Sequence, residues 1–107
     1  MKLLLILLFI FLFFSFHVPT SHLAGGWQPI ENTTDSHVKD IGNYAVSEHN
    51  NLEFVRVVSG ETQVVAGTNY RLVIKAMDAE GNVARYQAVV WEREWEGFRQ
   101  LTSFQQV

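Results

Sequence analysis

Residues 35–50 decide the fold of this chain, and they read DSHVKDIGNYAVSEHN. In and just after this stretch, apolar residues recur at spacings of three, four and seven, at Val38, Ile41, Ala45 and Leu52. Such spacing places one apolar stripe along a helix and leaves its other faces polar. The stretch therefore predicts a single amphipathic helix from about residue 35 to residue 50.

Both ends of the predicted helix carry residues that suit helix termini. Asp35 or Ser36 can cap the first turn, because a short side chain with an oxygen accepts a hydrogen bond from a free backbone N–H. Asn50 and Asn51 can end the helix, since asparagine tolerates the left-handed backbone conformation found there. The predicted helix is thus bounded on both sides and has about four turns.

After the helix, the hydrophobic pattern changes to the alternation typical of strands. Four strands are predicted, at residues 52–59, 70–76, 84–91 and 98–104. Glu80-Gly81-Asn82 is a turn signal between two of them. Before the helix, residues 27–30 are predicted to be extended, and Pro29 favours a sheet edge. These elements predict an α+β fold in which an antiparallel β-sheet meander wraps on a single long α-helix.

The start of the chain predicts a leader that is not part of this fold. Lys2 is followed by residues 3–14, which are almost wholly Leu, Ile and Phe, and residues 18–24 are small or turn-forming. This order is typical of a secretory signal peptide. A membrane anchor is the weaker alternative, because a span needs about 20 apolar residues. We expect a signal peptide over residues 1–22, cleaved within 20–24, and a domain over residues 23–107.

This leader also predicts where the protein is found. We expect it to enter the secretory pathway and to be secreted, either extracellular or vacuolar, with no membrane contact in its mature form. Asn32-Thr33-Thr34 is an acceptor sequence for N-linked glycosylation, which a protein on that route would meet. Asn32 precedes the predicted helix and is expected at the surface.

The composition limits the chemistry that the chain can perform. The chain has no cysteine, so disulfides, a thiolate nucleophile and cysteine metal sites are absent. Its formal charge is −3, or −4 without Lys2, and no basic stripe predicts a nucleic-acid partner. His37 and His49 fall on the helix without an evident acid–base partner, and His49 is expected to be half-buried. We expect no enzymatic activity, no cofactor and no metal site.

One predicted connection between strands has an unexpected composition. Residues 63–67 read QVVAG, whereas a tight hairpin connection normally holds Gly, Asn or Asp. Val64 and Val65 are β-branched and apolar, and exposed apolar residues at a loop indicate a contact site. The alternative is that the strand continues through the valines and that the turn lies elsewhere.

Two further places are not explained by the fold. Trp95 stands among charges in residues 92–97, and tryptophan is a favoured interface anchor, although it could instead fold back on the sheet. Gly25-Gly26 lets the backbone pass close to another surface, although such glycines are often flexible linker. The first and third connections of a meander emerge at the same end of the sheet. We therefore expect all three places to form one apolar edge.

These motifs together resemble those of the cystatins, a family of inhibitors of papain-like cysteine proteases. Residues 63–67 match the QVVAG hairpin loop of that family, and residues 41–50 resemble the helix signature of its plant members. Gly25-Gly26 and Trp95 occupy the family's other two contact positions. The resemblance runs across essentially the whole predicted domain, and the absence of cysteine is similar to the plant type.

The resemblance implies a cystatin-like fold and a wedge that enters the active-site cleft of the protease. The implied protease-binding residues are Gly25, Gly26, Gln63, Val64, Val65, Ala66, Gly67 and Trp95. The resemblance also implies that the protein is a monomer and that its inhibition is reversible and competitive. Glu94 departs from the pattern, because plant members commonly have proline before this tryptophan. The alternative function is a cystatin-fold module that has lost inhibition and binds another protein partner.

Overall fold

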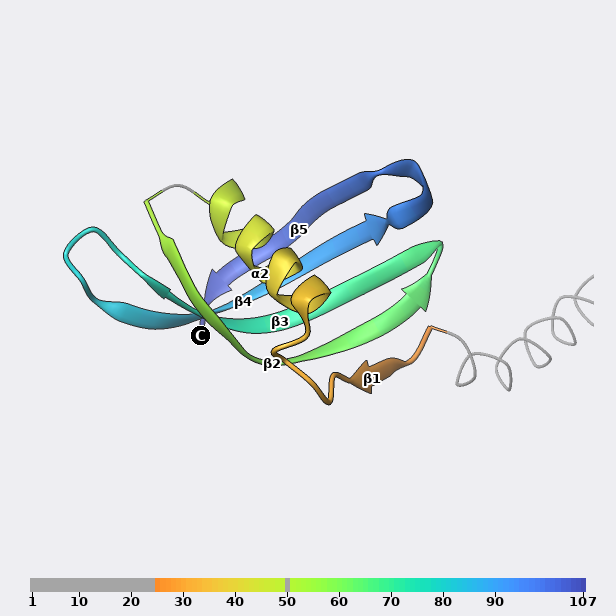
Figure 1. Ribbon diagram of the computed structural model, residues 1–107, viewed down its shortest axis with the longest axis horizontal. Helices are drawn as coiled ribbons and strands as arrows, with labels where there is room; N and C mark the ends of the chain where they lie inside the picture. The colour runs from red at the N-terminus through yellow and green to blue at the C-terminus, as the bar shows by residue number, and fades with distance from the viewer. Residues whose placement is uncertain (1–24, 50) are drawn as a thin grey trace, which may run out of the picture.

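The computed structural model describes residues 25–49 and 51–107, which fold as a helix on an antiparallel sheet (Figure 1). The sheet has five strands in the order β1-β2-β3-β4-β5. They are β1 (Trp27–Pro29), β2 (Glu53–Val65), β3 (Gly67–Met77), β4 (Val83–Arg93) and β5 (Phe98–Gln106), and the helix α2 (Ser36–Glu48) separates β1 from β2. The predicted α+β fold is confirmed. The predicted signal peptide and its cleavage site lie outside the described residues.

The N-terminus of α2 forms as the sequence predicts, whereas the helix ends at Glu48, two residues before the predicted end at residue 50. The carboxylate of Asp35 caps the first turn and accepts hydrogen bonds from the backbone N–H groups of His37, at 3.1 Å, and Val38, at 3.3 Å. Beyond the last helical residue, Asn51 adopts the left-handed conformation with a φ of 73°. The capping oxygen satisfies N–H groups that the helix itself leaves unpaired.

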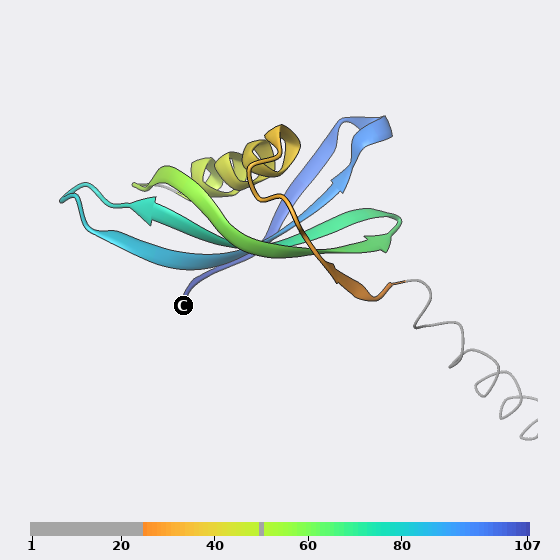
Figure 2. The same ribbon diagram turned by 60° about the horizontal axis from the view of Figure 1, so that its bottom comes forward.

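The hydrophobic core lies between α2 and one face of the sheet (Figure 2). It consists of Val38, Ile41, Ala45, Val46, Val57, Leu72, Ile74, Ala76, Ala88 and Val90. Gly42 permits this close packing, because an added Cβ would lie 2.8 Å from the side chain of Val57 and 2.9 Å from that of Phe54. The apolar stripe predicted from the sequence is therefore the face that the helix buries.

The sheet curves around the helix (Figure 2), and both the β2–β3 ladder and the β4–β5 ladder contain register shifts. The register of β2 on β3 shifts between Phe54 and Arg56 and again between Val57 and Ser59. A bulge of this kind bends a strand and increases its twist. Within the described residues, no helix is long and apolar enough to cross a membrane.

The expectation that His49 is half-buried is wrong. His49 is exposed and follows the last residue of α2 in an extended conformation, so it leaves the apolar stripe of the helix. Its ring stacks on Phe104, with ring centroids 4.4 Å apart. His37 and His49 therefore lie at opposite ends of the helix and do not form an acid–base pair.

Candidate functional site

The QVVAG segment forms the tip of the β2–β3 hairpin. The ladder continues through Val64, paired with Thr68, and Val65, paired with Gly67, so that Ala66 alone makes the turn. The strand therefore does continue through the valines, which is the alternative left open by the sequence. The valines nevertheless remain exposed, Val64 by 67% and Val65 by 40%. The tip is an apolar projection in which the strand pairing continues to Val65.

Gly67 is required at this tip for two reasons. Its φ of 103° belongs to a region that side chains disfavour. An added Cβ would also lie only 2.2 Å from the carbonyl oxygen of Glu92 and 2.8 Å from Cγ of Arg93. The β2–β3 tip thus packs directly against the end of β4.

The connection between β4 and β5 presents Trp95 to solvent. Residues Glu94–Glu96 form one turn of 3-10 helix, and Gly97 closes the turn with a φ of 61°. Trp95 is 70% exposed, which excludes the alternative that it folds back on the sheet. An exposed indole of this kind is a typical interface anchor.

The N-terminal glycines lie beside the β2–β3 tip. Gly25 and Gly26 lead into β1, whose Trp27 pairs with Gln63 near the end of β2. The side-chain amide of Gln63 donates a hydrogen bond to the carbonyl oxygen of Gly25. Gln63 therefore fastens the N-terminal segment to the first loop, instead of pointing away from the fold.

All three sequence-predicted contact elements lie at one end of the sheet. In both views of the ribbon, the start of β1, the β2–β3 tip and the β4–β5 connection stand at the end away from the β3–β4 turn (Figures 1 and 2). The register agrees, because Thr68 near the first tip pairs with Glu92 near the second. The expectation that these elements share one edge is confirmed, whereas their contact with a protease stays a prediction.

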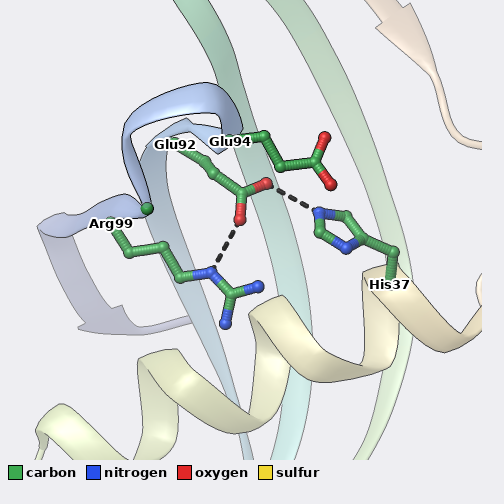
Figure 3. Close-up of a pocket in the computed structure, with 5 residues that line it drawn as sticks. His37, Glu92, Glu94 and Arg99 are labelled. Carbon is green, nitrogen blue, oxygen red and sulfur yellow. Dashed lines mark hydrogen bonds and ion pairs between the residues drawn. The ribbon is translucent and has the colours of Figure 1, made fainter.

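The prediction that Glu92 belongs to the last connection between strands is wrong. Glu92 lies in β4, on the same face as Ala88 and Val90, and only 6% of it is exposed. One carboxylate oxygen is 2.6 Å from Nε2 of His37, and the other accepts a hydrogen bond of 2.7 Å from Nε of Arg99 (Figure 3). Arg99 also forms an ion pair of 2.8 Å with Asp40 of α2. Alternation in β4 was the signal that could have found this burial.

This ion cluster changes the pKa values of the groups around it. Burial by itself raises the pKa of Glu92, but the hydrogen bonds and charges of Arg99 and His37 outweigh burial and hold that pKa below its ordinary value. Burial, together with the negative charges of Glu92 and Glu94, raises the pKa of Tyr70 to about 12. The cluster lines a cavity of about 440 Å³ together with Glu94 and Gly97.

The cluster joins α2 to the base of the second loop. Potential metal-ligand atoms of His37, Glu92 and Glu94 lie within 4.8 Å of one another, a grouping that the sequence interpretation missed. Both oxygens of Glu92 are already engaged, and the adjacent guanidinium of Arg99 opposes a second cation. The arrangement is that of a structural ion-pair network across the helix–sheet interface.

Asn32, the predicted glycosylation acceptor, lies at the surface between β1 and α2. Its side-chain oxygen accepts hydrogen bonds from the backbone N–H of Thr34, at 3.1 Å, and from the Thr34 hydroxyl, at 2.6 Å. The acceptor sequence therefore forms an exposed turn and is free of the core.

Comparison with known proteins gives a consistent set of relatives. Residues 30–107 match the family described as aspartic acid proteinase inhibitor (SQAPI). The chain is 54% identical to cysteine proteinase inhibitor 5 of Arabidopsis thaliana over 87 residues, which cover 77% of this chain and 71% of that protein. It is 55% identical to cysteine proteinase inhibitor 1 of Actinidia chinensis var. chinensis over 89 residues, which cover 78% and 76%.

A solved structure shares the fold. A salivary cystatin from the soft tick Ornithodoros moubata superimposes with a TM-score of 0.69, covering 78% of this chain and 97% of that one at 24% sequence identity. At this identity the likeness concerns the fold alone.

Proposed function

Since this chain belongs to the plant cystatins, we propose that it is a reversible, competitive inhibitor of papain-like cysteine proteases. The matched family and the plant relatives are described as inhibitors, so the chain stands among inhibitors and not among enzymes. The observation that carries the proposal is the convergence of Gly25–Gly26, the exposed valines and Trp95 at one end of the sheet (Figure 1).

In the proposed complex, these three elements enter the active-site cleft as one wedge. Val64, Val65 and Trp95 provide apolar surface that binding would remove from water. The ladder extends to Val65, so the first loop is ordered before binding and loses little conformational entropy in the complex. We expect the wedge to cover the catalytic cysteine and histidine without presenting a peptide bond for attack, so that the inhibitor dissociates intact.

The class of protease follows from the more specific relatives. The matched family is described as an inhibitor of aspartic proteinases, whereas the plant relatives at 54% and 55% identity are named as inhibitors of cysteine proteinases. The name of an individual relative at this identity is more informative than the description of a whole family. The relatives' names therefore favour cysteine proteases as the target class. The QVVAG segment at an exposed tip supports the same choice.

We also propose that the mature protein is a secreted monomer, extracellular or vacuolar. The support for secretion is the predicted signal peptide of residues 1–22. Expression of the full chain in a eukaryotic host tests the first part, because protein that keeps residues 1–22 would contradict entry into the secretory pathway. Size-exclusion chromatography of the mature protein tests the second part, because elution as a dimer would contradict it.

A charge placed on the first loop tests the wedge. Val64→Asp would bury an unpaired carboxylate in the complex, so we expect papain inhibition to weaken by about 100-fold or more. Val83→Asp is the matched control, because Val83 is also an exposed strand valine, 54% exposed, at the far end of β4. Equal inhibition by the two variants would contradict the wedge and favour a module that binds its partner through another surface.

A further inference from the structure

The sheet face opposite the helix carries a second set of contacts behind the wedge. Alternation along β4 places Ala88, Val90 and Glu92 toward the helix, which leaves Trp91 and Arg93 on the other face. Arg93 pairs with Phe98 across the β4–β5 ladder, so Phe98 lies on the same face. We call Trp91, Arg93, Phe98 and Glu96 the inter-loop cluster.

The guanidinium of Arg93 lies beside both aromatic members of the inter-loop cluster. The Cζ atom of Arg93 lies 4.6 Å from the ring centroid of Trp91 and 4.8 Å from that of Phe98. The two rings meet edge-on, with centroids 5.3 Å apart and an angle of 74° between their planes. Cation–π contacts on two rings restrict a side chain that would otherwise be mobile.

The inter-loop cluster touches both loops of the wedge. Toward the first loop, the indole N–H of Trp91 donates a hydrogen bond of 2.8 Å to the carbonyl oxygen of Ala66. The side chain of Arg93 also lies under Gly67, because a Cβ added to that glycine would come 2.8 Å from its Cγ. The first loop therefore rests on two consecutive outward-facing residues of β4.

Toward the second loop, Arg93 binds the acidic residue that follows Trp95. Its Nε lies 2.8 Å from a carboxylate oxygen of Glu96. The N–H does not point along the line to that oxygen, so the contact is an ion pair and not an aligned hydrogen bond. This pair joins the two ends of the 3-10 turn that displays Trp95.

We propose that Arg93 is a positioning residue that couples the two loops of the wedge, and this proposal rests on the proposed inhibitory function. Its aliphatic stem supports Gly67, its guanidinium is held by Trp91 and Phe98, and its charge holds Glu96. The coupling stiffens the second loop, because position 94 is a glutamate and no proline fixes the backbone before Trp95. Arg93 thus acts through the orientation of Trp95 and of the valine tip.

The test compares Arg93→Ala with Arg85→Ala, an exposed arginine near the other end of the same strand. Amide hydrogen exchange in the free protein measures the order of residues 64–67 and 94–97. We expect Arg93→Ala to raise exchange at both loops by about fivefold or more, and Arg85→Ala to leave both unchanged. We also expect Arg93→Ala to weaken papain inhibition by roughly tenfold, through faster dissociation.

Two further variants separate positioning from a general loss of structure. Arg93→Lys keeps the aliphatic stem and the charge, and should restore most of the protection at residues 64–67. Glu96→Gln removes only the ion pair, and should raise exchange at residues 94–97 alone. These variants also test the proposal if Arg93→Ala does not fold.

The outcomes distinguish this proposal from the proposed function. If Arg93→Ala and Arg85→Ala show equal exchange at both loops, the positioning role of Arg93 is overturned, even if the wild type inhibits papain. If the wild type leaves papain active while Arg93→Ala still raises exchange at both loops, the inhibitory function is overturned and the coupling by Arg93 stands.

Discussion

Replacing Trp95 with alanine should remove a large part of the affinity for a papain-like protease without changing the fold. A tryptophan buries about 150–250 Å² when it is enclosed. Trp95 is 70% exposed in the free protein, so about 140 Å² of this area remains for a partner to cover. At about 25 cal/mol per Å², complete enclosure of this area would contribute about 3.5 kcal/mol.

The expected loss is smaller than this limit, because alanine keeps some of the area and an interface seldom encloses a ring completely. We expect about 2–3 kcal/mol, which corresponds to an inhibition constant about 30- to 150-fold higher. The melting temperature should stay nearly unchanged, since exposed side chains contribute within about 0.5 kcal/mol to stability.

The assay is steady-state inhibition of papain, with thermal unfolding of each variant as a check on the fold. Val83→Ala is the control, because Val83 is 54% exposed but lies at the opposite end of β4. It should inhibit like the wild type. A folded Trp95→Ala variant with unchanged inhibition would refute the role of Trp95 in the wedge.

Three further predictions follow from the same structure. In urea unfolding, Gly67→Ala should destabilise the protein by more than Gly81→Ala. Both glycines have a positive φ, but of the two added Cβ atoms only the one at position 67 would meet other atoms, 2.2 Å from the carbonyl oxygen of Glu92. Equal losses of stability would contradict the packing of this tip. Because the pKa of Glu92 is lowered in the folded state, its carboxylate stabilises the protein above its ordinary pKa of 4.5, and this stabilisation is lost as the pH falls through the lower folded value. The stability advantage of the wild type over Glu92→Gln should therefore shrink below about pH 4.5 in pH-dependent unfolding, and an advantage that grows on acidification would be inconsistent with the ion cluster. When a eukaryotic host secretes the chain, Asn32 should carry an N-linked glycan, seen as a mass shift that Asn32→Gln lacks. Enzymatic deglycosylation should leave papain inhibition unchanged. An unshifted mass, or a change in inhibition, would contradict this prediction.

The helix and the order of the strands could be predicted from the sequence, because both follow from local patterns. Val38, Ile41 and Ala45 mark the buried stripe at helical spacing, and Asp35 provides a cap that needs no tertiary information. The exposure of Trp95 could also be anticipated, since glutamates flank it on both sides.

The length of β2 could not be predicted in the same way. The expected strand ended at residue 59, whereas β2 continues to Val65. Its middle part contains Gly60 and Glu61, which are poor strand formers on their own. They are held in the sheet because β2 pairs with β1 on one side and with β3 on the other.

The contacts that support the candidate site depend on register, which local patterns do not specify. The run of charges that begins at Glu92 favours a loop, but alternation with Ala88 and Val90 turns Glu92 toward the helix. Its partners His37 and Arg99 come from α2 and β5, and only the folded sheet brings them together. The same holds for Arg93 under Gly67, which requires the β3–β4 ladder to be known.

The most direct test of the central claim is steady-state inhibition of papain by the domain of residues 23–107, with pepsin assayed beside it. We predict competitive inhibition of papain that increases the apparent KM at constant kcat, is reversed on dilution and releases intact inhibitor, while pepsin keeps its activity. A folded domain that leaves papain active at micromolar concentration, or that inhibits pepsin instead, would contradict the assignment as a cysteine protease inhibitor.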